Sequence, residues 1–522
     1  MSSSDIIRVL HVIPDLTLGG AGRALFELHE QAVEIGAAIQ EKIISLSAAS
    51  PEAIRQAKQV DITVLDCPDH TTIIDEINAC DVVLVHFWNS PELHALLCSE
   101  LPAMRIVFWS HIFGAHPPHI ISDELVAMAN IVVSTTPSTQ DLPAFRSLSL
   151  SAEEKEKRTI PGIGDFSRLK GYTFRPHEGI NVGYVGTVDY VKMHPQFASM
   201  TTAVKTPDAR FVVCGTGGAY HLLIQHVQNQ GIEERFDFRG YVEDILSVLE
   251  TLDIFGYPLC EDTYATSERS LQEAMYVGVP PVVFPYGGIP DLIADNDTGL
   301  VVRSEKEYVE AIEHLCENPD ERKRIGENAR NLIRRKHNEG QMATKMMNLF
   351  DELLSVPKRM RNREPLIVAD AVDDYSSASR FDGAKLFIRS IGDSAPWFAE
   401  SMADNSQNSL HNADERIAAS SPLLSSVASG GILNYRKNFP DDGYLAFWSG
   451  LVLARKNRPA LALAEFIRAR RNGVDHWRID WHLARTAAES GAGKLGLQAL
   501  DRLIQKAPDH EGVDELRARL TW

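Results

Sequence analysis

The chain has 522 residues, of which 44% are apolar, so it can form two or three domains with substantial hydrophobic cores. Its formal net charge of −19 and its pI near 5.4 argue against a nucleic-acid-binding protein, which would need a basic face. We therefore expect neither DNA nor RNA as a partner.

Cysteine usage and the lack of apolar spans indicate the compartment. No Cys-x-x-Cys pair occurs among the six cysteines, at 67, 80, 98, 214, 260 and 316, which favours reduced thiols and no zinc site. The N-terminus lacks the features of a signal peptide, and no apolar run approaches the length of a membrane span. We expect a cytoplasmic protein. Basic clusters at residues 155–158 and 358–363 leave peripheral contact with the inner face of the membrane open.

The first half of the chain alternates strand patterns with helical patterns. Residues 7–13 predict a strand, Gly19 and Gly20 follow it, and residues 24–35 carry an apolar helical pattern. A glycine pair in this place indicates either a tight turn or a loop whose backbone approaches a phosphate.

Two further strand patterns in this half end in histidine. Residues 81–86 end at His86, and residues 105–111 end at His111. Ligands of open parallel sheets bind at the carboxyl ends of the strands, so both histidines are candidate site residues. A purely structural role is the commoner one for a histidine at a strand end, and it remains the alternative.

The strand pattern restarts in the second half. Three apolar segments each run into a turn, and a lysine, Lys192, follows the first of them. The segments and their turn residues are 180–186 with Gly186, 209–215 with Gly215, and 236–242 with Val242. Each pattern by itself predicts only a strand followed by a turn.

Residues 261–285 give the strongest local pattern, because they predict a loop, a helix and a strand in succession. Thr266 and Ser267 are suitable N-caps, and Gly278 with Pro280 ends the helix. The N-terminus of such a helix offers backbone N–H groups and the positive end of its dipole to a phosphate.

Glu273 lies one turn inside this predicted helix. A carboxylate there can accept hydrogen bonds from sugar hydroxyl groups. The alternative is a capping box between Ser270 and Glu273, in which the carboxylate serves only its own helix.

This segment resembles the donor site of the retaining GT-B glycosyltransferases of family 4, also called glycosyl transferases group 1. Glu273-Ala-Met and Gly278-Val-Pro match the Glu-Ala-Met helix and the Gly-x-Pro-x-Val segment of that family. Glu268 matches the first glutamate of a subgroup. Most members place that glutamate at the position that Ala265 occupies here.

The resemblance covers roughly residues 5–355 and implies a role for each candidate residue. His111 is then near the donor sugar, Lys192 neutralises the leaving diphosphate, and the glycine loop lies under the diphosphate and acceptor. The implied catalytic residues are His111, Lys192 and Glu268, and the implied donor-binding residues are Gly19, Gly20, Gly186, Gly215, Val242, Ser267 and Glu273.

Two more positions depart from the family pattern. Gly22 stands where the family has a glutamate that contacts the acceptor, and Thr187 stands where it has an arginine. Arg269 and Arg239 are the cations considered as replacements for that arginine.

The function that the resemblance implies is transfer of a sugar from a nucleotide-diphosphate donor to an acceptor hydroxyl, with retention and with no metal or other cofactor. The expected acceptor is a glycan, a lipid-linked saccharide or a protein, as in polysaccharide biosynthesis. Two alternatives from other classes remain: a nucleotide-sugar epimerase on the same fold, and a non-catalytic scaffold whose C-terminal repeats bind a protein partner.

The predicted fold class is α/β, with two Rossmann-like domains in the GT-B arrangement followed by a mostly α-helical region. The predicted parts are an acceptor-side domain at 1–178, a donor domain at 179–337, a helix returning to the first domain at 338–357, a partly disordered connector at 358–440, and tetratricopeptide-like repeats at 441–522.

The repeat prediction depends on two sequence offsets. Trp448 and Trp481 are 33 residues apart, close to the tetratricopeptide length of about 34, and Ala462 and Ala499 are 37 apart. An ordinary helical bundle is the alternative. The acidic cluster at 370–374 is interpreted as solvated linker and not as a metal site.

Overall fold

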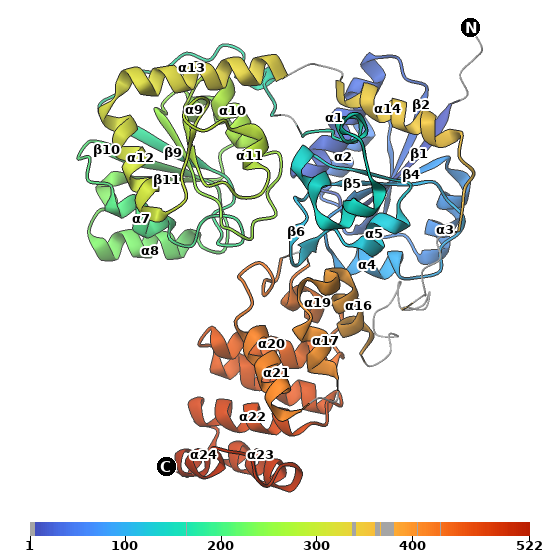
Figure 1. Ribbon diagram of the computed structural model, residues 1–522, viewed down its shortest axis with the longest axis vertical. Coiled ribbons are helices and arrows are strands. Elements are labelled where there is room, and N and C mark those ends of the chain that lie inside the picture. Colours follow the sequence, from blue (N-terminus) through green and yellow to red (C-terminus); the bar gives the residue numbers. More distant parts are fainter. Residues whose placement is uncertain are drawn as a thin grey trace.

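The protein is described here by a computed structural model with two α/β lobes and a helical region below them (Figure 1). The described residues are 6–162, 164–336, 341–360, 366, 381–403, 406–428 and 430–521. We call residues 6–162 together with 341–354 the first lobe, 164–336 the second lobe, and 381–521 the helical region. The acidic cluster at 370–374 lies outside the described residues.

The first lobe is built on a parallel six-stranded sheet with the order β3-β2-β1-β4-β5-β8. β4 is buried along its whole length, as expected for a strand covered by helices on both faces. Its strands are β1 (Ile7–Asp15), β2 (Ile39–Ser47), β3 (Thr63–Asp66), β4 (Val82–Phe87), β5 (Ile106–Ser110) and β8 (Ile131–Val133). Its helices are α1 (Gly20–Glu34), α2 (Pro51–Gln59), α3 (His70–Ala79), α4 (Pro91–Leu97), α5 (Asp123–Met128) and α6 (Ala152–Lys157), and β6 (Ala115–His116) pairs with β7 (His119–Ile120).

The second lobe repeats this plan with the order β11-β10-β9-β12-β13-β14, also parallel. Its strands are β9 (Ile180–Val185), β10 (Ala209–Cys214), β11 (Phe236–Gly240), β12 (Ile254–Tyr257), β13 (Pro281–Val283) and β14 (Leu300–Val301). Its helices are α7 (Phe197–Ala203), α8 (Tyr220–Gln230), α9 (Ile245–Leu249), α10 (Arg269–Val277), α11 (Ile289–Leu292), α12 (Glu305–Glu317) and α13 (Pro319–Lys336). The predicted fold class, two Rossmann-like units followed by helices, is confirmed.

Each sheet has a topological switch point, where the direction of winding reverses. In the first lobe it lies between β1 and β4, and in the second between β9 and β12. Loops that leave the carboxyl ends of such strand pairs separate and leave room for a ligand. The fold therefore provides two loop clusters at which functional residues can gather.

Helix α14 (Gln341–Leu354) belongs to the first lobe, although it follows the second in sequence. Met346, Phe350 and Leu353 lie in one hydrophobic cluster with Leu28 of α1 and residues of the first sheet. In Figure 1 the helix is drawn in yellow against the blue first lobe. The chain thus crosses between the lobes a second time.

The helical region begins earlier than the sequence predicted. Four helices occupy much of the predicted connector: α16 (Asp382–Ile391), α17 (Trp397–Met402), α18 (Gln407–Ala418) and α19 (Ile432–Asn438). Phe387, Phe398 and Tyr435 from these helices are fully buried and share a core with α20. The described part of residues 381–438 is therefore packed structure, and its Ser- and Ala-rich tracts are helix and turn.

The remaining helices form two successive hairpins with equal spacing. They are α20 (Gly443–Arg455), α21 (Pro459–Arg471), α22 (Trp477–Glu489), α23 (Gly493–Lys506) and, at the end, α24 (Val513–Leu520). The paired helices α20 and α22 begin 34 residues apart, and so do α21 and α23. Both offsets thus equal the tetratricopeptide length of about 34 that the tryptophan offset indicated to within one residue. The 37-residue offset, and the longer turn that it implied, is wrong.

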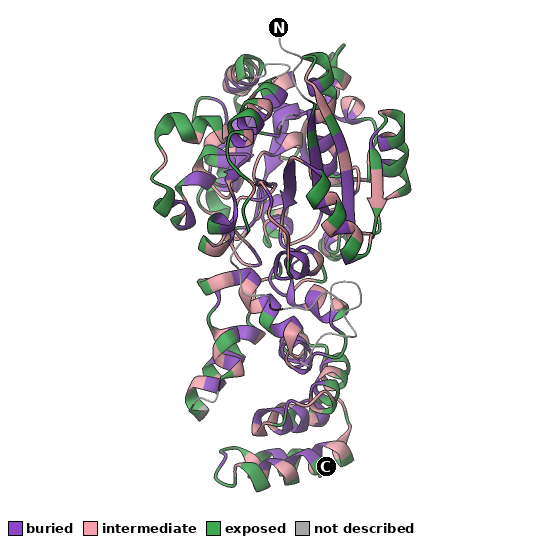
Figure 2. Ribbon diagram, turned by 90° about the vertical axis from the view of Figure 1, so that its right-hand side faces the viewer, coloured by how far each residue is buried: buried purple, intermediate pink, exposed green. Residues whose placement is uncertain are grey.

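The helical region is joined to the first lobe through buried contacts with α4 and its N-cap loop. Ala95 and Cys98 belong to the hydrophobic core of the helical region. Tyr435 donates a hydrogen bond to Asn89 Oδ1 at 2.9 Å, and Asn89 Nδ2 donates to Ser390 Oγ at 3.0 Å. Figure 2 shows the buried residues continuing from the sheets into the upper helices.

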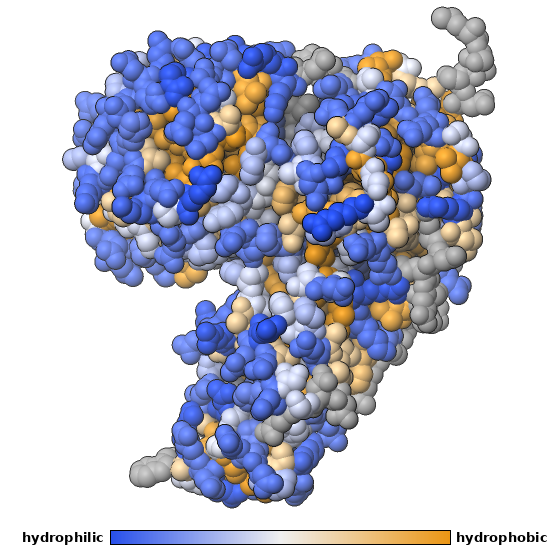
Figure 3. Space-filling view, in the orientation of Figure 1, coloured by the Kyte–Doolittle hydropathy of each residue, from blue (hydrophilic) through white to orange (hydrophobic). Residues whose placement is uncertain are grey.

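The face of the molecule in Figure 3 is largely hydrophilic. Among the described residues, no helix has the length and apolar character needed to cross a membrane.

Candidate functional site

Two loops at the switch point of the second sheet bring a lysine and a glutamate together. Lys192 follows β9 and Glu268 follows β12, and Lys192 Nζ lies 2.8 Å from Glu268 Oε2. Tyr257 donates a hydrogen bond to the same oxygen at 2.5 Å. Burial disfavours the charge of Lys192, but the Glu268 carboxylate outweighs it and holds the pKa of Lys192 well above its ordinary value. Lys192 is therefore a fixed cation at this edge.

Helix α10 begins at Arg269, with Glu268 as its N-cap. Thr266 and Ser267, predicted as caps, lie before that position. The Ser267 hydroxyl instead accepts a hydrogen bond from the backbone N–H of Gly162 at 3.0 Å, so it joins the second lobe to the segment that links the lobes. The cap prediction is wrong by one or two residues, because Glu268 takes the extended cap conformation itself.

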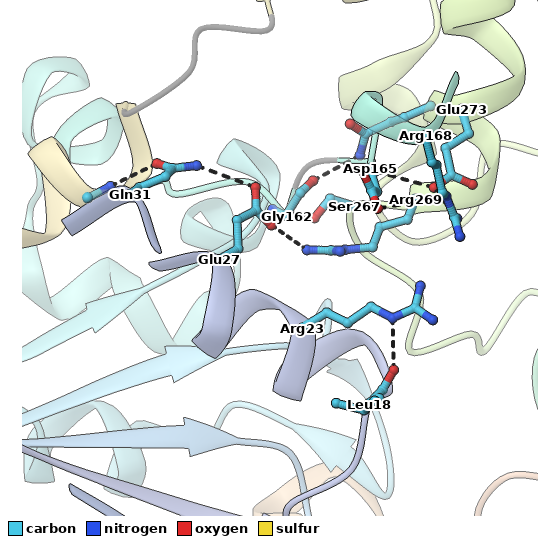
Figure 4. A network of polar contacts seen from close by, with 12 residues as sticks. Leu18, Arg23, Glu27, Gln31, Gly162, Asp165, Arg168, Ser267, Arg269 and Glu273 are labelled. Carbon is cyan, nitrogen blue, oxygen red and sulfur yellow. Dashed lines mark hydrogen bonds and ion pairs between the residues drawn. The ribbon is translucent and has the colours of Figure 1, made fainter. Parts of the chain in front are cut away.

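Glu273 is buried one turn inside α10 and contacts residues outside its helix. Its Oε1 lies 2.7 Å from Arg168 Nη2 and accepts a hydrogen bond from the backbone N–H of Asp165 at 3.3 Å (Figure 4). Ser270 donates to the carbonyl of Val185. These contacts are not those of the capping box between Ser270 and Glu273, which was the alternative in the sequence analysis. Burial raises the pKa of Glu273, and the charge of Arg168 opposes that shift.

His111 follows β5 at the edge of the first sheet. Its Nε2 lies 2.9 Å from Nδ1 of His86, and the two rings stack in parallel planes. His86 is fully buried, whereas His111 keeps partial exposure. Burial first, and the nearby charge of Arg269 second, lower the pKa of His111 to about 3, so its imidazole is neutral at pH 7.

Arg269 connects the two lobes. Its Nη2 lies 2.7 Å from Glu27 Oε2 of α1. Arg23, one turn earlier on α1, donates from Nε to the carbonyl of Leu18, and Figure 4 shows its guanidinium extending toward the space below Arg269. Arginines from both lobes thus approach the same space, and they add positive charge to that of Lys192.

The loop between β1 and α1 contains glycines at positions 19, 20 and 22, and backbone packing requires one of them. Gly19 is the N-cap of α1 and Gly20 its first residue. A Cβ atom on Gly22 would lie 1.8 Å from the carbonyl oxygen of Thr17. The departure from the family glutamate at Gly22 therefore has a steric reason, since any side chain there would collide with the loop.

Two second-lobe glycines pack against one another. Gly215 has a φ of +127°, and a Cβ on it would lie 1.8 Å from the carbonyl oxygen of Gly186. Val242 is half-buried in the loop that follows β11. These three residues belong to the turns at the carboxyl ends of β9, β10 and β11.

The other departures from the family pattern are also visible. Ala265 is a buried core residue, and Thr187 accepts a hydrogen bond at its carbonyl from Tyr184. Of the two arginines considered as replacements for Thr187, Arg239 pairs with Asp237, whereas Arg269 lies at the site.

A cavity of about 430 Å³ adjoins this site on the side of the linking segment. Its lining includes Thr136, Thr266, Ser267 and Gln272. Of the ten predicted site residues, Ser267 is the one that lines it. Most of the other predicted residues follow the strands of the two switch points, whereas His111, Gly215 and Val242 follow the neighbouring strands β5, β10 and β11.

Sequence reasoning missed several polar residues of this region. Arg168, Glu27 and Tyr257 contact the predicted glutamates or Arg269, but none stands in the motif that directed attention to α10. Their only sequence signal is a charged or hydroxyl group close to a predicted strand end or glycine turn.

Comparison with known proteins identifies the second lobe first. Residues 167–332 match the family model of glycosyl transferases group 1. The chain is 25% identical over 313 residues to D-inositol 3-phosphate glycosyltransferase of Corynebacterium aurimucosum, which covers 53% of this chain and 72% of that protein. It is 27% identical over 150 residues to alpha-D-kanosaminyltransferase of Streptomyces kanamyceticus, which covers 28% of this chain and 38% of that protein.

Solved structures agree in fold. Anabaena Alr3699/HepE in complex with UDP-glucose is similar with a TM-score of 0.53 at 16% identity, over 66% of this chain and 100% of that one. A glycosyltransferase from Rickettsia africae ESF-5 is similar with a TM-score of 0.53 at 14% identity, over 67% and 100%. The second lobe therefore matches the glycosyl transferases group 1, and the two lobes together share the GT-B fold of these solved structures.

Proposed function

We propose that the protein transfers a hexose from a nucleoside-diphosphate donor to an acceptor hydroxyl, with retention at the anomeric carbon. The observation that carries the proposal is the charge arrangement at the start of α10. There the buried carboxylates of Glu268 and Glu273 lie with the cations of Lys192 and Arg269 at the edge of the second sheet. The similarity to a protein solved with UDP-glucose supports a nucleotide sugar as the donor.

In this proposal the anomeric carbon–oxygen bond to the diphosphate breaks, and the acceptor oxygen takes its place. The acceptor proton leaves with the diphosphate. Charge develops on the leaving oxygen, and groups held ready for that charge lower the barrier most. The proposed sources of this stabilisation are Lys192, Arg269 and the backbone N–H groups at the start of α10.

We propose that these cations make a metal ion unnecessary. Lys192 is kept protonated by Glu268, so its charge is permanent at neutral pH. The matching test is to assay donor turnover with and without a chelator. An unchanged rate is expected, and a rate that falls and returns with added Mg²⁺ or Mn²⁺ would overturn this part of the proposal.

Glu273 is proposed to accept hydrogen bonds from hydroxyl groups of the donor. Its carboxylate is buried within the second lobe, where Arg168 and one backbone N–H are its partners. A carboxylate has two oxygens with about four acceptor positions, so a sugar hydroxyl can join these partners without displacing both.

The test begins with calorimetric titration of UDP, GDP and ADP, followed by the corresponding nucleotide sugars. One nucleotide should bind, and Glu273→Ala should weaken it by roughly 1–3 kcal/mol, the cost of losing a buried hydrogen-bonded group. Glu250→Ala is the matched control, because Glu250 is a buried carboxylate of the same lobe whose partner is Arg175. Absence of binding by all three nucleotides would overturn the proposal.

The anomeric outcome needs a separate measurement. Proton NMR of the reaction mixture gives the coupling constant of the anomeric proton in the donor and in the product, and this constant reports the anomeric configuration. Retention is expected. A nucleotide sugar epimerised without transfer would instead favour the epimerase alternative.

A further inference from the structure

A chain of three histidines and one glutamate crosses the first sheet. His111, His86, His11 and Glu41 come from β5 or its end, β4, β1 and β2, which are neighbours in that order in the sheet. The ring nitrogens of His111 and His86 are 2.9 Å apart, those of His86 and His11 are 3.0 Å apart, and His11 Nε2 lies 3.0 Å from Glu41 Oε1. His29 of α1 contacts the other Glu41 oxygen at 2.5 Å.

The inner members of this chain are closed off from solvent. His11 and His86 have no exposed surface, and 3% of the Glu41 side chain is exposed. Only His111, at the cleft end, and His29, at the other end, keep partial exposure. The hydrogen atoms between these nitrogens are therefore arranged by the chain itself and not by water.

Glu41 is ionised and acts as the fixed end. Burial disfavours its charge, but hydrogen bonds from His11 and His29 outweigh burial and lower the pKa of Glu41 to about 2. The bond to Glu41 raises the pKa of His29, which favours a protonated His29 as the counterion. An ionised carboxylate only accepts hydrogen bonds.

One tautomer of each ring follows from that constraint. His11 donates its Nε2 hydrogen to Glu41, which leaves its Nδ1 as an acceptor. His86 then donates from Nε2 to His11, and His111 donates from Nε2 to His86. The remaining nitrogen of His111, Nδ1, carries no hydrogen in this arrangement.

We propose that Glu41 is a positioning residue that holds His111 as a hydrogen-bond acceptor at Nδ1 for a hydroxyl group of the donor sugar. This inference rests on the proposed function. An acceptor nitrogen binds a hydroxyl and repels a phosphate oxygen, whereas Arg269 attracts phosphate. The pair therefore separates the two chemical parts of a nucleotide sugar: the sugar hydroxyl goes to His111 and the diphosphate to the arginine.

The hydrogen-bonded histidines are proposed to set the tautomer of His111, and this tautomer can be measured without substrate. We would label the full-length protein with ¹⁵N-histidine and read the tautomer of His111 from the shifts of its two ring nitrogens. Signals are assigned by single histidine substitutions. The hydrogen of His111 is expected on Nε2 in the wild type.

Glu41→Gln removes the acceptor-only end, because an amide both donates and accepts. The His111 signals should then shift toward a mixture of tautomers. His86→Gln interrupts the chain in the middle and should have the same effect at His111, which keeps the test decisive if the first variant does not fold. Glu76→Gln is the matched control, since Glu76 is a carboxylate beside the same sheet that pairs with Lys42.

Two results would overturn the inference. One is a wild-type His111 with its hydrogen on Nδ1. The other is an unchanged His111 tautomer in folded Glu41→Gln or His86→Gln. These spectra need no nucleotide, so they can contradict the role of Glu41 while the calorimetry still supports the transferase. They can equally support the role of Glu41 when no nucleotide binds. In the assay, turnover of the donor by Glu41→Gln should fall about tenfold, the size of one lost hydrogen bond.

Discussion

The two lobes have the same sheet topology but meet the cleft with different chemistry. The second lobe presents charged groups that are paired with each other, as Lys192 with Glu268 and Glu273 with Arg168. The first lobe presents a neutral imidazole, His111, whose partners extend inward to a buried carboxylate. The same fold therefore supplies paired charges at one sheet edge and a neutral imidazole at the other, which suits the first edge to a diphosphate and the second to uncharged hydroxyl groups.

The largest expected effect is on the charged edge. Lys192→Met should lower donor turnover by about 10²–10³-fold, as for removal of a single group that stabilises developing charge. It should also destabilise the protein, because Glu268 is left buried without its cation. Enzyme assays and thermal unfolding measure the two effects.

A second substitution separates them. In Lys192→Met with Glu268→Gln no buried charge is left unpaired, so thermal stability should recover while turnover stays low. Recovered turnover in that double variant would mean that Lys192 acts only through folding.

Acid should distinguish the two lobes next. Burial holds the pKa of His86 well below its ordinary value and the pKa of His111 at about 3. The unfolded chain therefore binds more protons than the folded one below about pH 6.5. As the pH falls below that value, the free energy of unfolding decreases by about 1.4 kcal/mol per pH unit for each such proton. Glu41, with a folded pKa of about 2, adds the same sign below its ordinary value of 4.5.

Glu273 of the second lobe has the opposite sign, whereas the lowered pKa of His194 in that lobe has the same sign as those of His86 and His111. Because the pKa of Glu273 is raised, the folded state holds that proton more readily than the unfolded state. The contribution of Glu273 to the free energy of unfolding therefore decreases as the pH rises, and not as it falls. Hydrogen exchange at pH 7 and pH 5 should therefore show the first sheet opening before the second. Earlier opening of the second sheet would contradict the comparison.

A smaller effect is expected from the bridge between the lobes. Arg269→Ala removes the partner of Glu27 and should cost about 1 kcal/mol, because both side chains are partly exposed. It also removes a charge that lowers the pKa of His111, so that pKa should rise. Histidine NMR titration measures the shift, and Glu27→Gln is the control that keeps Arg269. An unchanged pKa of His111 would mean that burial alone sets it.

The smallest effect is expected at a fully accessible pair. Lys306 and Glu310 lie one turn apart on α12, with 84% and 58% of their side chains exposed. Lys306→Ala should change the free energy of unfolding by less than about 0.5 kcal/mol. Chemical denaturation measures this change. A larger loss of unfolding free energy would mean that exposed ion pairs also contribute to stability, and the effects expected at the buried pairs could then not be attributed to burial.

The sequence predicted β1, β4 and β5 of the first lobe, the central strands of the second lobe and the residues local to α10, because buried parallel strands are apolar runs bounded by glycine and histidine. It did not single out β2, β3, β8 or β14. It also missed the partners of the residues local to α10. Arg168 is 105 positions from Glu273, and Glu27 is 242 positions from Arg269. The first contact depends on how distant segments of the second lobe pack together, and the second depends on how the lobes approach each other. No local pattern records either. His11 was hidden for a similar reason, since it stands inside an apolar strand.

The helical region shows a different limit. Two tryptophans suggested an offset of 33 residues, but Trp481 does not occupy the position of Trp448 in its hairpin. A better signal was the pattern Ala462-x-x-x-Phe466 with Gly450 before it, because Gly450 packs directly against the Phe466 ring. The helices at 382–438 were misread as connector because their Ser-rich turns dominate the composition.

The attachment of the helical region to α4 has a mechanical consequence. Since Ala95 and Cys98 lie in the same core as the helices, we expect the first lobe and that region to move as one platform. The second lobe contacts this platform mainly through polar groups such as Arg269 with Glu27, together with Tyr264, which packs against the core of the first lobe. Ion pairs and hydrogen bonds break and reform far more readily than a core. A molecule held by the helices therefore keeps its distance to His111 when the second lobe moves.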